Sequence, residues 1–283
     1  MELAGIGSAN LRSIPVERAR QMDLLALERA IEEDRAAGLH PFLVVATAGT
    51  VNSGPSIASK PLPISPVSVA SGFPSTVRSA LWLFSDELRA KFRGIERSSS
   101  LALDFHKWGH VPYDAGFLLV RERELHRQAF AQDVAYLQRT NRGLTKGETW
   151  PCDLGPDLSR GSRALKTGMT LRVLGTDAIG RSIAHTCILA RYLGERLAGL
   201  NEIELKAPVD LNIVCFGIRG MGADDLKRLV LDLHEQGLAA PSWTMIDGEL
   251  TIRCAIVNHR TTRKDIDVFA GLLSQRILRL GAT

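Results

Sequence analysis

The sequence of 283 residues has few cysteines and no long apolar run. Its four cysteines are widely spaced and form no CxxC pair, so we expect neither a zinc site nor any other metal site, and we expect reduced thiols. No stretch approaches about 18 consecutive apolar residues, so no membrane span is predicted. The first residues lack a basic segment followed by a long apolar one, which argues against a secretory signal. These absences predict a cytoplasmic protein.

A strong excess of charge of one sign is also missing. The formal net charge is +4, and arginines are interspersed with acidic residues along the chain. Two short basic patches, "RTNRG" and "NHRTTRK", contain no aromatic residues, so nucleic-acid binding is not expected, whereas small anionic molecules are compatible ligands. Apolar residues make up 45% of the chain, enough for the core of one large domain or two modest ones.

Hydrophobic periodicity predicts an α/β part of the chain followed by a smaller α+β part. Short apolar runs in the first part are typical of strands covered on both faces of a parallel sheet. We place the boundary near Leu200, which gives domains 1–200 and 201–283. Helices are predicted in 22–38, 122–131 and 161–200, the last broken near Gly175, and strands in 41–49, 100–105 and 115–120. The second part is predicted as strand, helix, strand pair and helix in 203–219, 224–237, 242–257 and 262–278.

Residues 55–82 differ from the rest of the chain. This stretch of 28 residues contains five prolines and seven serines but no aspartate or glutamate, and it has neither helical nor strand periodicity. Its composition predicts a long, irregular surface loop. A loop of this length is unusual inside a compact domain, so the segment needs another explanation.

One lysine, Lys107, follows an apolar run in the stretch "DFHKW". A lysine is a nucleophile only as the free amine, and burial or nearby cations favour that form. A lysine at a strand end with aromatic neighbours is therefore a candidate covalent anchor for an aldehyde. The alternative is an ordinary surface lysine after a strand.

The longer stretch "DFHKW…VPYDAGFLLV" resembles the lysine segment of the group II pyridoxal-phosphate-dependent decarboxylases, the relatives of aromatic-L-amino-acid and glutamate decarboxylases. The stretches "PFLVVATAGTVNSG", "FRGIERSSSLALDFHKW" and "DVAYLQRTN" match the same family in order. Thr50 and Lys107 are 57 residues apart, as is usual in the family. The resemblance implies the C-terminal part of a fold-type I large domain of the aminotransferase-like α/β class, followed by a small α+β domain.

The resemblance also implies roles for five residues. Lys107 would bind the aldehyde of pyridoxal 5'-phosphate covalently, with His106 and Asp104 near the cofactor and Thr50 reaching into the site. Tyr136 would protonate the substrate carbon after carbon dioxide leaves, which requires an acid held over the cofactor. From the residues alone, simpler interpretations stay open: a buried histidine, a capping aspartate, a turn hydroxyl and an amphipathic tyrosine.

The implied activity is decarboxylation of an amino acid, in which the cofactor accepts the electron pair left behind. The implied partners are a small amino acid substrate and a second subunit, in a homodimer or in a pair with an intact homologue.

Three departures from the family set this chain apart. The family's ring-nitrogen aspartate lies about 32 residues before the lysine, where this chain has Ser75 and no carboxylate. Gly161, Ser162 and Gly168 stand where larger residues are expected, and the family's chains extend further at the N-terminus. We therefore interpret the chain as a truncated, impaired decarboxylase. The alternatives are a non-catalytic remnant or dimerising fragment, which these departures favour, and another fold-type I lyase or aminotransferase.

Residues 55–82, whose composition differs from the rest of the chain, include the position where the family's ring-nitrogen aspartate is missing. Suppose the coding DNA is read in a shifted frame, so that each new codon takes the third base of one codon and the first two bases of the next. Residues 74–80 can then encode "VDGAFG", and the codon of the new aspartate spans those of Ser75 and Thr76. The longer shifted reading, "VDRLEALADLARERGLWFPVDGAFG", contains a helix pattern, a glycine stop and a strand. We hypothesise two compensating frameshifts, one near Gly54 and one near residues 81–83.

Overall fold

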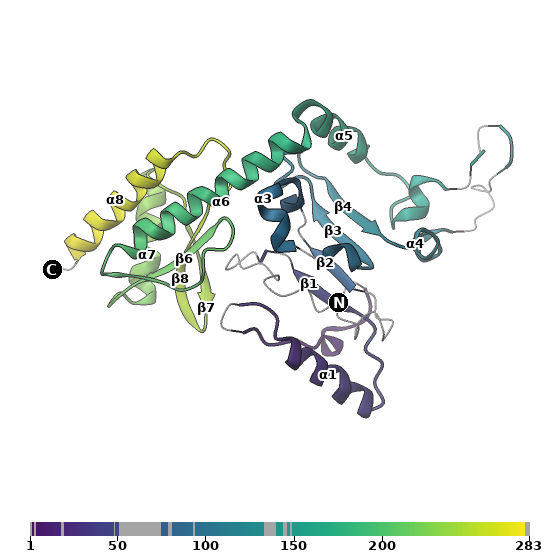
Figure 1. Ribbon diagram of the computed structural model, residues 1–283, viewed down its shortest axis with the longest axis horizontal. Helices are drawn as coiled ribbons and strands as arrows, with labels where there is room; N and C mark the ends of the chain where they lie inside the picture. The colour runs from purple at the N-terminus through teal and green to yellow at the C-terminus, as the bar shows by residue number, and fades with distance from the viewer. Residues whose placement is uncertain are drawn as a thin grey trace.

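The computed structural model places two β-sheets side by side, joined by one long helix (Figure 1). It describes residues 1–283 except 1, 3, 18–19, 48, 51–74, 79–80, 93, 133–139, 144–145, 148 and 281–283. The linking helix, α6 (Thr176–Ala198), begins above the first sheet and ends beside the second.

The first sheet has four strands in the order β1-β2-β3-β4, namely β1 (Val44–Thr47), β2 (Ser75–Arg78), β3 (Ser100–Asp104) and β4 (Gly116–Val120). Strands β1, β2 and β3 are parallel, so their carboxyl ends meet at one edge of the sheet. The predicted strands at 41–49, 100–105 and 115–120 are confirmed.

Strand β4 corrects one prediction. It runs antiparallel to β3, with Ser100 opposite Val120 and Asp104 opposite Gly116. Four of its five residues are exposed, so it is not the parallel strand covered on both faces that its apolar run indicated. The physical reason is the short connection after β3, since a parallel strand needs a crossover of a dozen or more residues.

Strand β2 corrects a second prediction, the irregular loop over residues 55–82. Ser75–Arg78 lies between β1 and β3 and pairs with both, and Leu81–Phe84 forms a 3₁₀ helix in which Leu81 is buried. Pairing with two neighbours can impose strand geometry on a segment whose own pattern is weak. Residues 55–74 of the expected loop lie outside the described part of the chain.

Helices confirm the periodicity in this half of the molecule. Asp23 caps α1 (Leu24–Ala36) by accepting a hydrogen bond from the Ala26 amide at 3.0 Å. Helices α5 (Arg163–Leu174) and α6 are separated at Gly175, whose φ of 79° is one that glycine adopts readily. The other helices among the described residues of this half are α3 (Asp86–Arg89), α4 (Arg123–Phe130) and the 3₁₀ turns Ser8–Asn10, Ala90–Phe92, Ile95–Arg97 and Pro151–Leu154.

The second half is the predicted small α+β unit. Its antiparallel sheet has the order β5-β6-β8-β7, and α7 (Ala223–Glu235) and α8 (Arg263–Leu280) accompany it. The stretch expected to hold one strand holds two, because the segment between them reverses the chain. The strands are β5 (Ile203–Leu205), β6 (Ile213–Ile218), β7 (Ser242–Ile246) and β8 (Glu249–Ala255).

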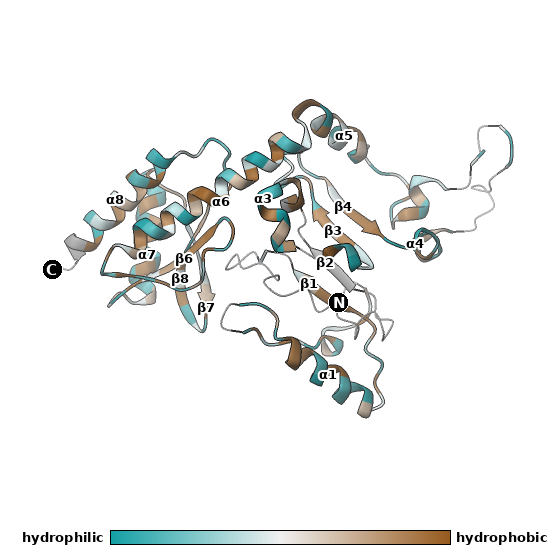
Figure 2. Cartoon of the chain, in the orientation of Figure 1, coloured by the Kyte–Doolittle hydropathy of each residue, from teal (hydrophilic) through white to brown (hydrophobic). Residues whose placement is uncertain are grey.

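Two hydrophobic cores lie along α6. Its first half contributes Ile179 and Ile183 to the core under β3, and its second half contributes Leu193 to the core of the small sheet. Strand β6 of the small sheet is largely brown in Figure 2, and it is buried at every position. The domain boundary near Leu200 stays a prediction, since α6 belongs to both cores.

The cysteines form no disulfide bond. All four cysteines are free, and burial raises the pKa of the Cys187 and Cys254 thiols to about 12. Within the described residues, no helix is long and apolar enough to cross a membrane. No group of three or more possible metal ligands occurs among those same residues.

Candidate functional site

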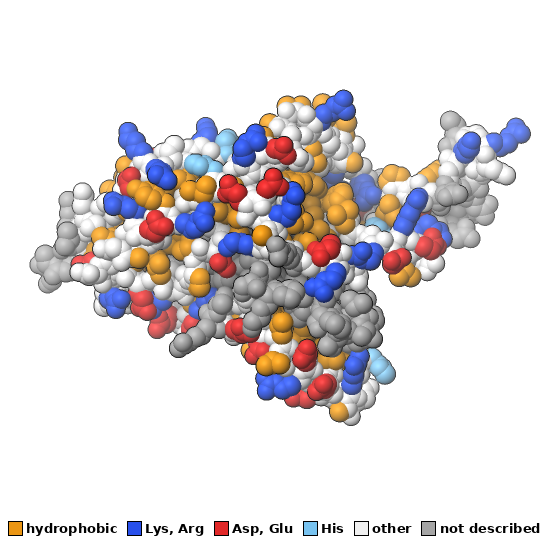
Figure 3. Space-filling view, in the orientation of Figure 1, with side chains coloured by type: hydrophobic (Ala, Val, Ile, Leu, Met, Phe, Trp, Pro, Cys, Tyr) orange, Lys and Arg blue, Asp and Glu red, His pale blue; other side chains and the backbone are white. Residues whose placement is uncertain are grey.

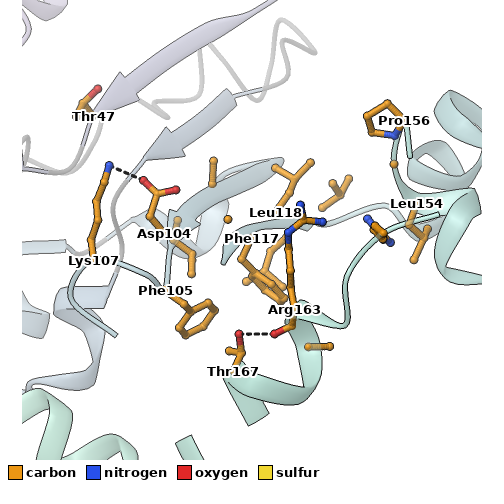
Figure 4. A pocket seen from close by; sticks show the side chains of 18 of the residues that line it. Thr47, Asp104, Phe105, Lys107, Phe117, Leu118, Leu154, Pro156, Arg163 and Thr167 are labelled. Carbon is orange, nitrogen blue, oxygen red and sulfur yellow. Dashed lines mark hydrogen bonds and ion pairs between the residues drawn. The ribbon is translucent and has the colours of Figure 1, made fainter. Parts of the chain in front are cut away.

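Lys107 lies in the tight turn that follows β3. The Lys107 amide donates to the Asp104 carbonyl at 3.1 Å, and the Phe105 amide donates to the Ala115 carbonyl at 2.9 Å, which ties the turn to the start of β4. The Lys107 ammonium donates to Asp104 Oδ2 at 2.7 Å (Figure 4). The turn therefore holds Lys107 and Asp104 in direct contact, and both were expected to lie in the site.

Gly109 allows this turn to close. A Cβ at this position would lie 2.7 Å from the Phe105 carbonyl oxygen and 3.1 Å from the Phe105 Cα, both backbone atoms that cannot move aside. Gly109→Ala is therefore expected to destabilise the fold by about 1–3 kcal/mol. Chemical denaturation measures the loss. Gly116→Ala is the matched control in the same hairpin, because its nearest contact is at 3.9 Å. Equal stability of the two variants would contradict this account.

The ring of His106 contacts the segment that leads into β4. Its Nδ1 accepts a hydrogen bond from the Ala115 amide at 2.9 Å, and the ring meets Tyr113 edge to face at 4.8 Å between centroids. His106 thus braces the connection between β3 and β4 and does not line the cavity described next. A role for His106 at a cofactor stays a prediction.

A cavity of about 1590 Å³ opens beside Lys107. Thr50, Asp104 and Lys107, three of the five residues predicted for the site, line it, and Thr47 from the end of β1 lies near them (Figure 4). Phe117 and Leu118 of β4 and Thr167 of α5 line the part farther from the lysine. The fifth predicted residue, Tyr136, lies outside the described residues.

The cavity carries mostly positive charge. Arg20, Arg160 and Arg163 line it together with Lys107, and Asp104 is the only carboxylate among the described residues of the lining. Part of this charge is balanced, because Arg20 pairs with Asp247 and Arg163 pairs with Asp114. This charge favours an anionic ligand such as a phosphate ester. Because Asp104 already pairs with Lys107, the described lining offers no second carboxylate for a cationic ring nitrogen.

Sequence reasoning missed the arginines of the cavity. Arg163 begins α5 and donates from Nε to Asp114 Oδ2 at 2.9 Å, and this contact holds the pKa of the Asp114 carboxyl below its usual value. The Thr167 hydroxyl donates to the Arg163 carbonyl one turn later. Asp114 stands just before β4, so the pair fastens the start of α5 to the sheet. No spacing in the sequence indicated this contact between residues 49 apart.

Comparisons with known proteins come from a family model and from curated relatives. The model described as the pyridoxal-dependent decarboxylase conserved domain matches residues 2–219. Aromatic-L-amino-acid decarboxylase of Bacillus atrophaeus is 28% identical over 94% of this chain and 57% of its own length. The enzyme of the same name from Drosophila melanogaster is 32% identical over 94% of this chain and 52% of its own length. The chain thus spans about half the length of the curated relatives it matches.

Solved structures show the same fold. The chain superposes on the Oryza sativa TDC solved with PLP and tryptamine with a TM-score of 0.86 at 24% identity, over 99% of this chain and 59% of that one. Tryptophan decarboxylase of Catharanthus roseus, solved with L-tryptophan, gives a TM-score of 0.83 at 24% identity, over 98% of this chain and 59% of that one. These likenesses show the fold-type I architecture.

Proposed function

The chain belongs to the pyridoxal-dependent decarboxylase family, and from this premise we propose that it carries the lysine-bearing part of an amino acid decarboxylase site. Lys107 is the proposed anchor of pyridoxal 5'-phosphate. The observation that carries the proposal is its position after β3, in contact with Asp104 and facing a large cavity rich in positive charge.

The residues present fit this cofactor at two of its groups. The amine of Lys107 suits the aldehyde, and the arginines of the cavity suit a phosphate. Of these, Arg160 pairs with no carboxylate in the described structure, whereas Arg20 and Arg163 also pair with Asp247 and Asp114. When bound, the cofactor supplies an electron sink for the pair that remains after carbon dioxide leaves. The hydroxyl of Thr50, in the same cavity, is the proposed third contact.

Asp104 and Tyr136 have separate proposed roles. Asp104 accepts a hydrogen bond from the Lys107 ammonium and positions the lysine at the cavity. Tyr136, from the segment outside the described residues, is the proposed proton donor to the substrate carbon.

The proposed setting of the reaction is cytoplasmic, with an amino acid as substrate and a dimer as the assembly. The four free cysteines fit a reducing compartment. Relatives are named for aromatic amino acids and for histidine, so an amino acid is the proposed substrate class of this chain.

Borohydride trapping tests the proposal. The chain is mixed with pyridoxal phosphate, the visible absorbance of the lysine-bound cofactor is recorded, and borohydride then fixes the cofactor as a stable secondary amine. Peptide mass mapping should place the added mass on Lys107. Labelling spread over surface lysines, with no preference for Lys107, would contradict an anchoring role. Carbon dioxide release then separates decarboxylation from transamination.

A non-catalytic role is the second candidate, and one observation favours it. Among the described lining residues no carboxylate remains for the ring nitrogen, because Asp104 is engaged by Lys107. A chain that binds the cofactor but releases no carbon dioxide would support this candidate.

A further inference from the structure

An ion pair joins the segment before α1 to the small sheet. Arg20 donates from Nη2 to Asp247 Oδ2 at 2.5 Å and from Nη1 to Asp247 Oδ1 at 3.3 Å. The guanidinium thus meets the carboxylate as a fork, with two parallel hydrogen bonds. The two residues are 227 positions apart in the sequence. We call this contact the Arg20–Asp247 bridge.

Arg20 is held in a backbone conformation that is uncommon for arginine. Its φ of 59° lies in the left-handed region. A tight turn imposes this value, because the Arg20 amide donates to the Glu17 carbonyl at 2.7 Å and the Glu17 amide donates to the Gln21 carbonyl at 2.8 Å. The side chain of Arg20 is only 19% exposed, and it lines the cavity beside Lys107. One guanidinium therefore reaches both the small sheet and the cavity.

Asp247 belongs to a turn that does not depend on Arg20. Ile246 pairs with Glu249, so two residues join β7 to β8, and these are Asp247 and Gly248 with φ values of 52° and 81°. Positive φ at both positions is typical of a type I′ turn, in which aspartate and asparagine are both common before glycine. The Asp247 side chain is 79% exposed. Water can therefore solvate this carboxylate when Arg20 leaves it.

The hairpin of β7 and β8 keeps other contacts when the Arg20–Asp247 bridge is open. Lys206 Nζ donates to Glu249 Oε2 at 2.8 Å and to Glu204 Oε2 at 2.9 Å. The two strands also remain paired with each other from Ser242 to Ile246. Opening the bridge thus leaves the small sheet intact.

Positive charge gathers in the cavity and not on the outer surface. In Figure 3, the Lys and Arg side chains of the described residues are interspersed with Asp and Glu side chains and form no broad positive patch. In the cavity, Arg20, Arg160 and Arg163 accompany Lys107, and Asp104 is the single carboxylate among the described lining residues. A small anion is therefore attracted to the cavity more than to that surface.

We propose that Arg20 is an exchangeable anion-binding residue, which leaves Asp247 and binds the carboxylate or phosphate group of a ligand in the cavity. The inference rests on the proposed function for the cavity as the ligand site, but it requires no covalent link to Lys107. Asp247 and the ligand compete for one guanidinium. The Arg20–Asp247 bridge therefore lowers the apparent affinity of the cavity for anions, and an anion that binds there opens the bridge.

Ligand-observed NMR titration of the full chain tests the inference. The probes are inorganic phosphate and phenylacetate, which carry the two kinds of anionic group and no aldehyde for Lys107 to attack. Arg20→Gln should weaken the binding of at least one probe about tenfold, because it removes a charged pair of donors. The probe that weakens identifies the anionic group that Arg20 binds. Unchanged affinity for both probes overturns the inference.

Asp247→Asn should change the affinity in the opposite direction. It removes the competing carboxylate and suits the same turn, so the probe that responds to Arg20→Gln should bind about two- to fivefold more tightly. The matched control is Glu249→Gln, which removes one negative charge from the same hairpin, although Glu249 pairs with Lys206. This control should bind as the unaltered chain does. Equal tightening by both variants indicates a long-range effect of charge, and unchanged or weaker binding by Asp247→Asn shows no competition; each result overturns the inference.

A double variant separates competition from an independent effect of Asp247. In a chain with Arg20→Gln, the further change Asp247→Asn should leave the affinity unaltered, because no guanidinium remains to be released. A gain that persists in the double variant contradicts the exchange. Circular dichroism and thermal melting check that every variant folds. The comparison of Asp247→Asn with Glu249→Gln carries the test alone where Arg20→Gln does not fold.

The exchange and the anchoring role of Lys107 can fail separately. Probe binding that depends on Arg20 and Asp247, together with no borohydride labelling of Lys107, supports the exchange and contradicts the anchoring role. Labelling of Lys107, together with probe affinities that do not respond to Arg20→Gln, supports the anchoring role and overturns the exchange.

Discussion

Lys107→Ala should abolish the visible absorbance and the borohydride-stable mass increase that pyridoxal phosphate gives with this chain. The substitution removes the amine that faces the cavity, and no other lysine lines that cavity among the described residues. A covalent link to the cofactor requires such an amine, so the expected loss is complete and not partial. Absorbance titration and peptide mass mapping measure it.

The matched control is Lys264→Ala. Lys264 is exposed near the start of α8, in the small domain, and it does not line the cavity. This variant should keep the full signal of the unaltered chain. Persistence of the signal in Lys107→Ala, or an equal drop in both variants, would rule out Lys107 as the anchor and indicate random modification of surface lysines.

The coding DNA of residues 55–80 is expected to encode a "VDxAxG"-like string when it is read one base out of frame. The shifted string would replace β2 (Ser75–Arg78), the strand between β1 and β3. In the present register Ser75 and Thr76 lie at the amino end of β2, opposite Val44 and Val45, so the restored strand has to place its aspartate nearer the carboxyl edge, where Thr47 and Asp104 line the cavity. Sequencing the DNA decides the matter, and a shifted frame without such a string ends the frameshift hypothesis.

A chain with the frame restored should bind pyridoxal phosphate more tightly. A hydrogen bond to a charged group contributes about 1.5–3 kcal/mol, so the expected gain in affinity is about tenfold to a hundredfold. The control is an otherwise identical chain with asparagine in place of the restored aspartate, which keeps the shape and removes the charge. Equal affinity of the restored chain, its asparagine control and the present chain would show that a ring-nitrogen carboxylate is not what this site lacks.

The predictions from sequence succeeded where a pattern is local and long. The periodic segments that became α1, α5, α6, α7 and α8 needed no knowledge of their neighbours, because helical hydrogen bonds join residues four apart. The break at Gly175 was visible for the same reason. The sequence also singled out Lys107, because its neighbours in the chain carry the family resemblance, and its role as the cofactor anchor stays a prediction.

Contacts between segments far apart in the sequence could not be predicted from such local patterns. Strand β2 has no pattern of its own and is a strand because β1 and β3 flank it. The pairing of Arg163 with Asp114 joins the first residue of α5 to the segment just before β4. The sequence of neither segment predicts this contact. Each of these features depends on the packing of the whole chain.

The sequence by itself determined the family and the absence of a carboxylate at Ser75, and it predicted Lys107 as the anchor, because each of these depends only on which residues occur and in what order. Only the tertiary structure decided that β4 runs antiparallel, that its apolar side chains are exposed, and that Lys107 and β4 line the same cavity. An apolar run looks the same in the sequence whether its faces are covered or bare. Burial is a property of the neighbours that the fold supplies, and at β4 the described chain supplies them on one edge alone.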